Sequence, residues 1–321
     1  MRNLHFALAT ITLFIFLISC KTNNPVLTIK TTKVLVTDAV SSGSGIIHND
    51  DSLIILGDDA AYYAQMALSN QGYVRKSISE NANHKRVPKL IKNDIESAIF
   101  ASIKGQPFVL GFGSGGITPY RDTLFAMPLT ETATRFKVSL LPIYNAIRKK
   151  VVLSESELNI EGAAMLGDQL ILFNRGNNFA VVFSWPIFSK YIKHPANTEI
   201  PPFKIVKFIL PIFNKFPVGI SGACEINDSE ILFTASLEET TDFINDGVVK
   251  GSYIGILKFS LSGEIELTAL EPLKDASGNV LADKLESITI IKKDGDTIDV
   301  VAVADNDDGK SKLFYMTLTI R

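Results

Sequence analysis

Short apolar runs that alternate with polar positions follow one another along most of this chain, and each run ends at Asn, Asp or Gly. Residues 159–178 are one example, with the sequence NIEGAAMLGDQLILFNRGNN. A glutamate and three tiny residues come first, and two apolar runs follow on either side of a Gly-Asp turn. Alternation of this kind predicts β-strands joined by tight turns.

The same arrangement recurs five times. Each copy starts with Ser or Glu, continues with Gly or Ser and an apolar residue, and leads into a strand, a polar turn and a more hydrophobic strand. We call the first residue of each copy the signature residue; the five are Ser44, Glu96, Glu161, Ser221 and Glu286. They are separated by 52, 65, 60 and 65 residues. Repeats of this length with several strands each are typical of β-propeller blades.

The last copy is one strand short. Third and fourth strands can be read after each of the first four signatures, whereas the fifth copy ends at Arg321 after its third strand. Residues 26–36, VLTIKTTKVLV, provide a spare strand before the first signature. Pairing of this strand with the last blade would remove an exposed sheet edge. We therefore predict an all-β fold, a five-bladed β-propeller of four-stranded blades closed by the N-terminal strand, as one domain over residues 26–321. A six-bladed propeller would need a blade without the signature.

The N-terminus has the features of a targeting segment. Arg2 precedes an apolar run over residues 6–18, and the run closes on Leu-Ile-Ser-Cys. This ending resembles the bacterial lipoprotein cleavage box, which implies a signal peptide over residues 1–19 and a lipidated tether over residues 20–25. We expect Cys20 to attach the protein to a membrane of the bacterial cell envelope. The alternative is an ordinary signal peptide with a chance cysteine.

Charge and cysteine content exclude some classes of protein. The chain has 32 basic and 34 acidic residues, and no predicted element carries a cluster of Lys and Arg. Nucleic acid is therefore not an expected partner. Cys224 is the second of two cysteines, so no disulfide framework is expected.

The signature residues predict a metal site. The innermost strands of a propeller surround a central channel, so the two serines and three glutamates would form a ring. Two carboxylates about 4 Å apart repel by on the order of 4 kcal/mol at an effective dielectric constant near 20. An all-oxygen ring suits Ca²⁺, and we predict Ca²⁺ bound by Ser44, Glu96, Glu161, Ser221 and Glu286. In the alternative, the glutamates accept hydrogen bonds from backbone amides and bind no metal.

The order Ser, Glu, Glu, Ser, Glu over five blades, together with SGIIHNDDSLIILGDD at residues 44–59, resembles the calcium-activated nucleotidase (apyrase) family. The resemblance implies a propeller with one Ca²⁺ in its tunnel. It also implies that Asp58 and Asp59 are the catalytic aspartates and that Arg175 occupies an arginine position of that family. The residues after the aspartates, Ala60-Ala61-Tyr62, depart from the family's Arg-Thr-Gly. The Glu-Gly-small signatures are also similar to those of phytase-like esterase propellers.

A phosphate site is predicted at the ends of the second strands, which meet on one face of a propeller. The glycine-rich loop Gly113-Ser114-Gly115-Gly116 would turn its amides toward an anion, and Arg121 and Arg175 would bind phosphate. Asp58 and Asp59 would orient a water molecule near the metal. In the alternative, the loop is a plain hairpin connection and the aspartates are turn residues.

Three functions stay open at this point. The first is a Ca²⁺-dependent phosphohydrolase that acts on nucleotides or phosphate esters, with a small phosphorylated molecule as its ligand. The second is a non-catalytic propeller that binds an unknown ligand or a protein. The third is an esterase or lactonase of the phytase-like kind.

Overall fold

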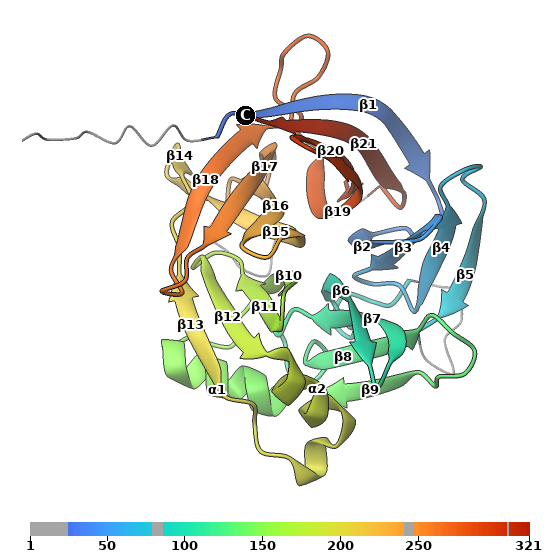
Figure 1. Ribbon diagram of the computed structural model, residues 1–321, viewed down its shortest axis with the longest axis vertical. Coiled ribbons are helices and arrows are strands. Elements are labelled where there is room, and N and C mark those ends of the chain that lie inside the picture. Colours follow the sequence, from blue (N-terminus) through green and yellow to red (C-terminus); the bar gives the residue numbers. More distant parts are fainter. Residues whose placement is uncertain (1–24, 79–85, 241–246, 307) are drawn as a thin grey trace, which may run out of the picture.

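The strands of the protein form five antiparallel sheets arranged around a central axis (Figure 1). This computed structural model describes residues 25–78, 86–240, 247–306 and 308–321. The prediction of a five-bladed propeller is confirmed. Cys20, the signal peptide and most of the predicted tether lie outside the described residues.

In each of the first four blades the strands follow one another outward from the axis in chain order. In the last blade the outermost strand comes from the N-terminal end of the chain. Blade 1 contains β2 (Gly43–Asn49), β3 (Ser52–Gly57), β4 (Tyr62–Ala67) and β5 (Tyr73–Ser77). Blade 2 contains β6 (Ile95–Ile103), β7 (Gln106–Gly113), β8 (Thr123–Pro128) and β9 (Phe136–Ser139). Blade 3 contains β10 (Ile160–Leu166), β11 (Gln169–Asn174), β12 (Phe179–Ser184) and β13 (Phe203–Lys207).

Blades 4 and 5 complete the circle. Blade 4 contains β15 (Phe216–Asn227), β16 (Glu230–Glu238), β17 (Val249–Phe259) and β18 (Ile265–Pro272), and the short β14 (Ile212–Phe213) pairs with β15. Blade 5 contains β19 (Lys284–Asp294), β20 (Thr297–Asp305), β21 (Ser311–Ile320) and β1 (Leu27–Thr37). As predicted, the N-terminal strand β1 closes the last blade by pairing with β21 from Leu27 opposite Ile320 to Thr37 opposite Ser311.

Two helices were not predicted. α1 (Leu141–Val151) follows β9, and α2 (Trp185–Lys193) follows β12 and continues into the 3₁₀ turn η1 (Pro195–Asn197). Both helices have a proline in their first turn, where its missing N–H costs nothing. Their buried side chains extend the core of blades 2 and 3. Among the described residues, none of the helices is long and apolar enough to span a bilayer.

The innermost strands position the signature residues. β2, β6, β10, β15 and β19 each contact the next one and close a ring. Each of the five strands has a β-bulge near its start, and the residue that the bulge leaves without a partner is the signature residue, namely Ser44, Glu96, Glu161, Ser221 and Glu286 in turn. A bulge redirects a side chain relative to the pleat of its strand. The signature is therefore a repeated backbone feature as well as a repeated residue type.

The small residue after each signature allows neighbouring inner strands to approach each other. A Cβ atom on Gly222 would lie 2.5 Å from the Cα of Ser287 and 2.7 Å from the carbonyl oxygen of Glu286. Glycine is thus required where blades 4 and 5 meet. The other four positions also carry Gly or Ser, in keeping with the tight packing around the axis.

Candidate functional site

A cavity of about 600 Å³ lies at the end of the tunnel where the innermost strands begin and the second strands end. Eight carboxylates line it, from Asp58, Asp59, Asp94, Glu96, Glu161, Glu238, Glu286 and Asp305. Six basic side chains also line it, from Arg86, Lys89, Lys92, Arg121, Arg175 and Lys284. Among the described residues that line the cavity, acidic groups therefore outnumber basic ones.

A second repeated position contributes to this lining. The residue two places before each signature lines the cavity in every blade; these residues are Ser42, Asp94, Asn159, Gly219 and Lys284. Asp94 and Lys284 were missed from the sequence, although the position repeats in the segments SGSG, DIES, NIEG, GISG and KLES. Glu238 and Lys92 were also missed, and no periodic signal marks either residue.

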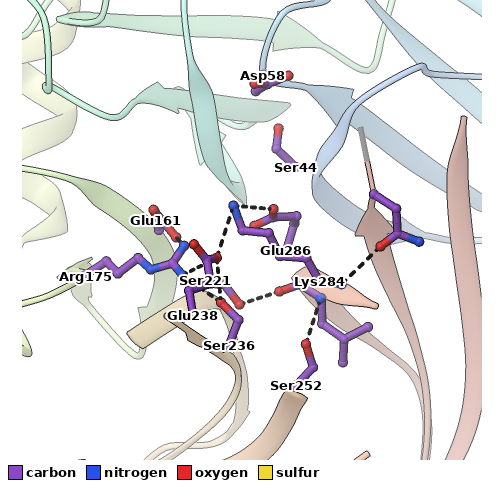
Figure 2. A network of polar contacts seen from close by, with 12 residues as sticks. Ser44, Asp58, Glu161, Arg175, Ser221, Ser236, Glu238, Ser252, Lys284 and Glu286 are labelled. Carbon is purple, nitrogen blue, oxygen red and sulfur yellow. Dashed lines mark hydrogen bonds and ion pairs between the residues drawn. The ribbon is translucent and has the colours of Figure 1, made fainter. Parts of the chain in front are cut away.

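Arg175 connects blade 3 with blade 4 (Figure 2). Its Nη1 lies 2.6 Å from Oε2 of Glu161, and its Nη2 lies 2.6 Å from Oε1 of Glu238. Nη2 also donates to the hydroxyl of Ser236 at 2.7 Å. The side-chain amide of Asn159 donates to the other oxygen of Glu161 at 2.6 Å. The guanidinium group is thus held between two buried carboxylates.

Lys284 extends this arrangement into blade 5 (Figure 2). Its Nζ lies 3.4 Å from Oε1 of Glu238 and 3.2 Å from Oε1 of Glu286. Acidic and basic groups therefore alternate across three blades. Gly219 makes room for Arg175, because a Cβ atom at this position would lie 2.8 Å from both Cγ and Nε of the arginine.

A second cluster joins blades 1 and 2. Carboxylate oxygens of Asp58, Asp94 and Glu96 all lie within 4.8 Å of one another. The ammonium group of Lys92 contacts Asp58 and lies 2.6 Å from Oδ1 of Asp94. Nη1 of Arg121 lies 2.7 Å from Oδ2 of Asp94. The aspartates of this cluster are therefore paired with bases.

One oxygen of Asp58 and the carboxylate of Glu96 lack such partners among the described residues. Oδ1 of Asp58 is buried and accepts no hydrogen bond within the described structure. Glu96 forms no hydrogen bond or ion pair with any residue in the described ranges, although its carboxylate lies beside Asp58 and Asp94. These oxygens are where a further cationic group would find acceptors.

The carboxylates at the axis have raised pKa values. Burial raises the pKa of Glu96 well above its usual value, the charges of Asp94, Asp58 and Glu286 raise it further, and Lys92 opposes the rise. Burial also raises the pKa of Glu286 to about 8, although Lys284 opposes this. The pKa of Glu161 is raised by burial and held down by Arg175. At neutral pH, full ionisation of the glutamates would require an additional positive charge.

The two signature serines bind the backbone of the neighbouring blade. The hydroxyl of Ser44 donates to the carbonyl of Ile95, and the hydroxyl of Ser221 donates to the carbonyl of Leu285 at 2.5 Å. In both cases the acceptor precedes the signature glutamate of the next blade. Both serine hydroxyls thus donate hydrogen bonds from one blade to the next. Ser221 is not among the residues that line the cavity.

These contacts test how well the predicted five-residue ring suits Ca²⁺. The five signature residues do surround one axis, but Arg175 and Lys284 already contact Glu161 and Glu286, and the serine hydroxyls donate to the backbone. A single ion held by all five residues fits this arrangement poorly. Asp58, Asp94 and Glu96 fit a metal ion better because their oxygens converge.

The predicted phosphate loop, residues 113–116, forms hydrogen bonds within the protein. The amide of Ser114 donates to the carbonyl of Asp94, that of Gly115 to the carbonyl of Arg121, and that of Gly116 to the hydroxyl of Ser114. None of the four loop residues lines the cavity, whereas Arg121 and Arg175 do. An anion at this loop would have to displace internal acceptors, so its role in phosphate binding stays a prediction.

Asp58 and Asp59, the predicted catalytic pair, follow β3 and line the cavity. Asp58 belongs to the carboxylate cluster described above. Asp59 accepts hydrogen bonds from the hydroxyl of Ser42 at 2.5 Å and from Nε of Arg86 at 2.6 Å. Both carboxylates are within the cavity, and their catalytic role stays a prediction.

Comparisons with known proteins show a family, and they show no activity. Residues 39–318 match the model of a family described as a family of unknown function (DUF6929). The search of curated proteins gave no match. Among solved structures, the chain is similar to a glutaminyl cyclase from Myxococcus xanthus, with 11% identity, coverage of 91% of this chain and 97% of that chain, and a TM-score of 0.47.

It is also similar to the major allergen Mala s 1 of Malassezia sympodialis, with 8% identity, coverage of 88% and 95%, and a TM-score of 0.49. A third similarity, to a putative gluconolactonase, has 10% identity, coverage of 84% of this chain and 71% of that chain, and a TM-score of 0.39. At these identities the similarities concern the fold alone.

Replacement of Arg175 by Met should destabilise the propeller strongly. Glu161 and Glu238 would both lose a partner at 2.6 Å while remaining buried. Removal of one partner from a buried ion pair costs about 3–5 kcal/mol, measured as the free energy of unfolding in urea. The control is Arg86→Met, whose side chain is 48% exposed and which should cost about 1 kcal/mol or less. Equal losses for the two variants would contradict the buried role of Arg175.

The pH dependence of stability should depend on Glu286. Because its pKa rises from 4.5 to about 8 on folding, the folded protein binds more protons than the unfolded chain between these pH values. The free energy of unfolding therefore falls as the pH rises through this window, by on the order of 1 kcal/mol per pH unit for one such group. Urea unfolding at several pH values should show a flatter profile for Glu286→Gln. The exposed control Glu266→Gln should keep the wild-type slope; an unchanged slope in Glu286→Gln would refute the assignment.

Proposed function

The chain belongs to the family of unknown function (DUF6929), and we propose that it is an envelope-anchored propeller that binds a cation in its axial cavity, with Ca²⁺ as the first candidate. The observation that carries this proposal is the convergence of Asp58, Asp94 and Glu96, whose carboxylate oxygens lie within 4.8 Å of one another. Ca²⁺ takes six to eight oxygen ligands in flexible geometry, so three carboxylates completed by water would satisfy it.

The charges around these three residues support a cationic occupant. Lys92 and Arg121 supply two positive charges to the three carboxylates. Glu96 remains without a direct partner among the described residues, and its pKa is raised first by burial and then by the charges of Asp94 and Asp58. A divalent cation at this cluster would offset the charge of Glu96 and take the buried Oδ1 of Asp58 as a ligand. Its binding would move the ammonium group of Lys92 aside, because that group lies between Asp58 and Asp94.

Ca²⁺-dependent hydrolysis of nucleotides or phosphate esters is the second candidate function. It is favoured by the presence of Asp59, Arg121 and Arg175 in the same cavity as the carboxylate cluster. A bound Ca²⁺ would polarise a phosphate oxygen and lower the pKa of a water molecule. Asp59 is held in place by Ser42 and Arg86 and would orient that water. The esterase or lactonase alternative receives no comparable support from the described residues that line the cavity, none of which is a histidine.

Calcium should raise the melting temperature of the wild-type protein above its value in EDTA. Because Glu96 has the carboxylate without a partner, Glu96→Gln should lose most of this shift, and Asp94→Asn should reduce it. Glu266→Gln, on the exposed side of β18, should keep the whole shift. Each variant is compared with itself in EDTA, which removes any effect of the substitution on stability alone. A wild-type protein whose melting temperature does not respond to calcium, and which shows no binding heat in calorimetry, would end the proposal.

The same protein samples test the second candidate function, Ca²⁺-dependent phosphohydrolysis. Phosphate release from UDP, GDP, ADP and a chromogenic phosphate ester is measured with calcium and with EDTA. Release that needs calcium and is lost in Asp58→Asn would support phosphohydrolysis. No release from any of these compounds, alongside a calcium shift in melting temperature, would leave a binding protein and reject the hydrolase.

We also propose that acylated Cys20 holds the protein on the membrane, as the ending Leu-Ile-Ser-Cys at residues 17–20 suggests. A multiply acylated cysteine gives stable anchoring, whereas one chain alone binds reversibly. Cys20→Ser should therefore move the protein from the membrane fraction to the soluble fraction of expressing cells, without change in its melting temperature. Recovery of both forms in the soluble fraction would rule the anchor out.

A further inference from the structure

The axial cavity is much larger than a metal ion requires. Its volume of about 600 Å³ lies within the range of about 300–1,000 Å³ that is typical of small-molecule sites. The carboxylate cluster of Asp58, Asp94 and Glu96 belongs to blades 1 and 2. The cavity continues from there to Glu161, Glu238 and Glu286 in the other three blades. A cation held at the first cluster would therefore leave most of the space to another ligand.

The residues that line the cavity indicate how polar a fitting ligand would be. Among the described residues, no aromatic side chain lines the cavity, and Val87, Pro88 and Pro217 are the larger apolar members of the lining. Flat aromatic ligands and quaternary ammonium groups are recognised by aromatic faces, which the described part of the lining does not offer. Most of the lining residues carry a charged or hydrogen-bonding group, and the aliphatic parts of their side chains contribute apolar surface as well. The lining thus suits a small hydrophilic molecule.

The charges of the lining residues indicate whether the ligand would be a cation or an anion. Five of the six basic side chains already contact a carboxylate; these are Arg86, Lys92, Arg121, Arg175 and Lys284. A phosphate or carboxylate ligand would have to break these ion pairs to gain a partner. The eight carboxylates exceed the six bases, so a positively charged ligand would instead reduce an existing imbalance.

Of the three signature glutamates, Glu96 and Glu286 have the fewest close contacts to basic and amide groups, although the charge of Lys92 also acts on Glu96, and a positively charged group of a ligand would bind there. Glu96 has no direct partner among the described residues. Glu286 has Lys284 at 3.2 Å, and that ammonium group is shared with Glu238. Both glutamates line the cavity, Glu96 on the inner strand β6 and Glu286 on the inner strand β19. The charge of Glu286 raises the pKa of Glu96.

We propose that the axial cavity binds a small hydrophilic molecule with a primary ammonium group, and that this group lies between Glu96 and Glu286. A primary ammonium group has three N–H donors, enough for both carboxylates and one further acceptor. Asn159 also lines the cavity. Its side-chain amide group donates to Glu161, so its side-chain carbonyl oxygen can accept a hydrogen bond from a hydroxyl group of the ligand. This inference extends the proposed cation site to an organic ligand, and it rests on the cavity being a cation site without requiring that Ca²⁺ be the metal.

Matched pairs of ligands test the proposal. Glucosamine is compared with N-acetylglucosamine, and 1,5-diaminopentane with 1,5-pentanediol, by calorimetry and by the shift in melting temperature. EDTA is present throughout, so no metal contributes. N-acetylglucosamine keeps the sugar ring but carries an acetyl group that removes the charge from the nitrogen, and 1,5-pentanediol keeps the five-carbon chain but replaces both amino groups by hydroxyl groups. We expect at least one amine to raise the melting temperature at least several-fold more than its neutral partner.

Variants of the two glutamates show where in the protein the amine binds. Glu286→Gln and Glu96→Gln should each reduce the shift caused by the amine at least several-fold, while keeping the side-chain volume and the fold. Glu266→Gln, remote from the cavity on β18, should respond like the wild type. Near-ultraviolet circular dichroism of each variant without ligand shows whether the propeller is intact. A shift that survives in Glu286→Gln would overturn the proposal, because the ligand would then bind elsewhere.

The outcomes separate this inference from the calcium site. An amine-specific shift without any calcium shift supports the inference and rejects Ca²⁺ as the bound cation. A calcium shift without an amine-specific shift leaves the metal site and rejects the inference. Equal shifts for the amines and their neutral partners, or no shift from either amine, also reject it.

Discussion

Burial of negative charge at the propeller axis is the constraint on which the rest of this structure depends. Five bulges in the inner strands bring the signature residues together, and three of these are glutamates. An unpaired carboxylate in such surroundings costs several kcal/mol. Arg175 and Lys284 neutralise the side formed by blades 3–5, and Lys92 neutralises the side formed by blades 1 and 2. Each of these bases contacts acids from two different blades, so electrostatic pairing also joins the blades.

The same pairing limits what the cavity can bind. Because arginine and lysine side chains are used to hold the blades together, little positive charge remains for an anionic ligand, although six basic residues line the cavity. The glutamates retain raised pKa values even beside these bases. Such residues lower stability at neutral pH and are typical of binding or catalytic sites. Stability and ligand preference thus have one physical origin, the excess of acidic over basic groups at the axis.

The fold could be predicted from the sequence because its information is local and repeated. The spacing of Ser44, Glu96, Glu161, Ser221 and Glu286 reveals the blades, and the missing strand at the C-terminus reveals the closure by β1. Helices α1 and α2 replace ordinary connections in two blades, so the blade pattern does not indicate them. The site was only partly predictable. Asp94 and Lys284 occupy a repeated position that could have been recognised, whereas Lys92 and Glu238 come from segments that meet only after the blades close around the axis.

Ammonium–carboxylate contact is the recurring chemistry of this cavity. Lys92 bridges Asp58 and Asp94, and Lys284 lies between Glu238 and Glu286. The protein therefore places an ammonium group between two carboxylates twice in one cavity, where none of the described lining residues is aromatic or a histidine. A ligand ammonium between Glu96 and Glu286 would repeat this arrangement a third time, with the two glutamates that the internal lysines neutralise least. A divalent ion would instead have to displace Lys92 from its carboxylates. The two proposed occupants thus differ in one respect: the metal competes with an internal base, and the amine uses acceptors that the internal bases leave available.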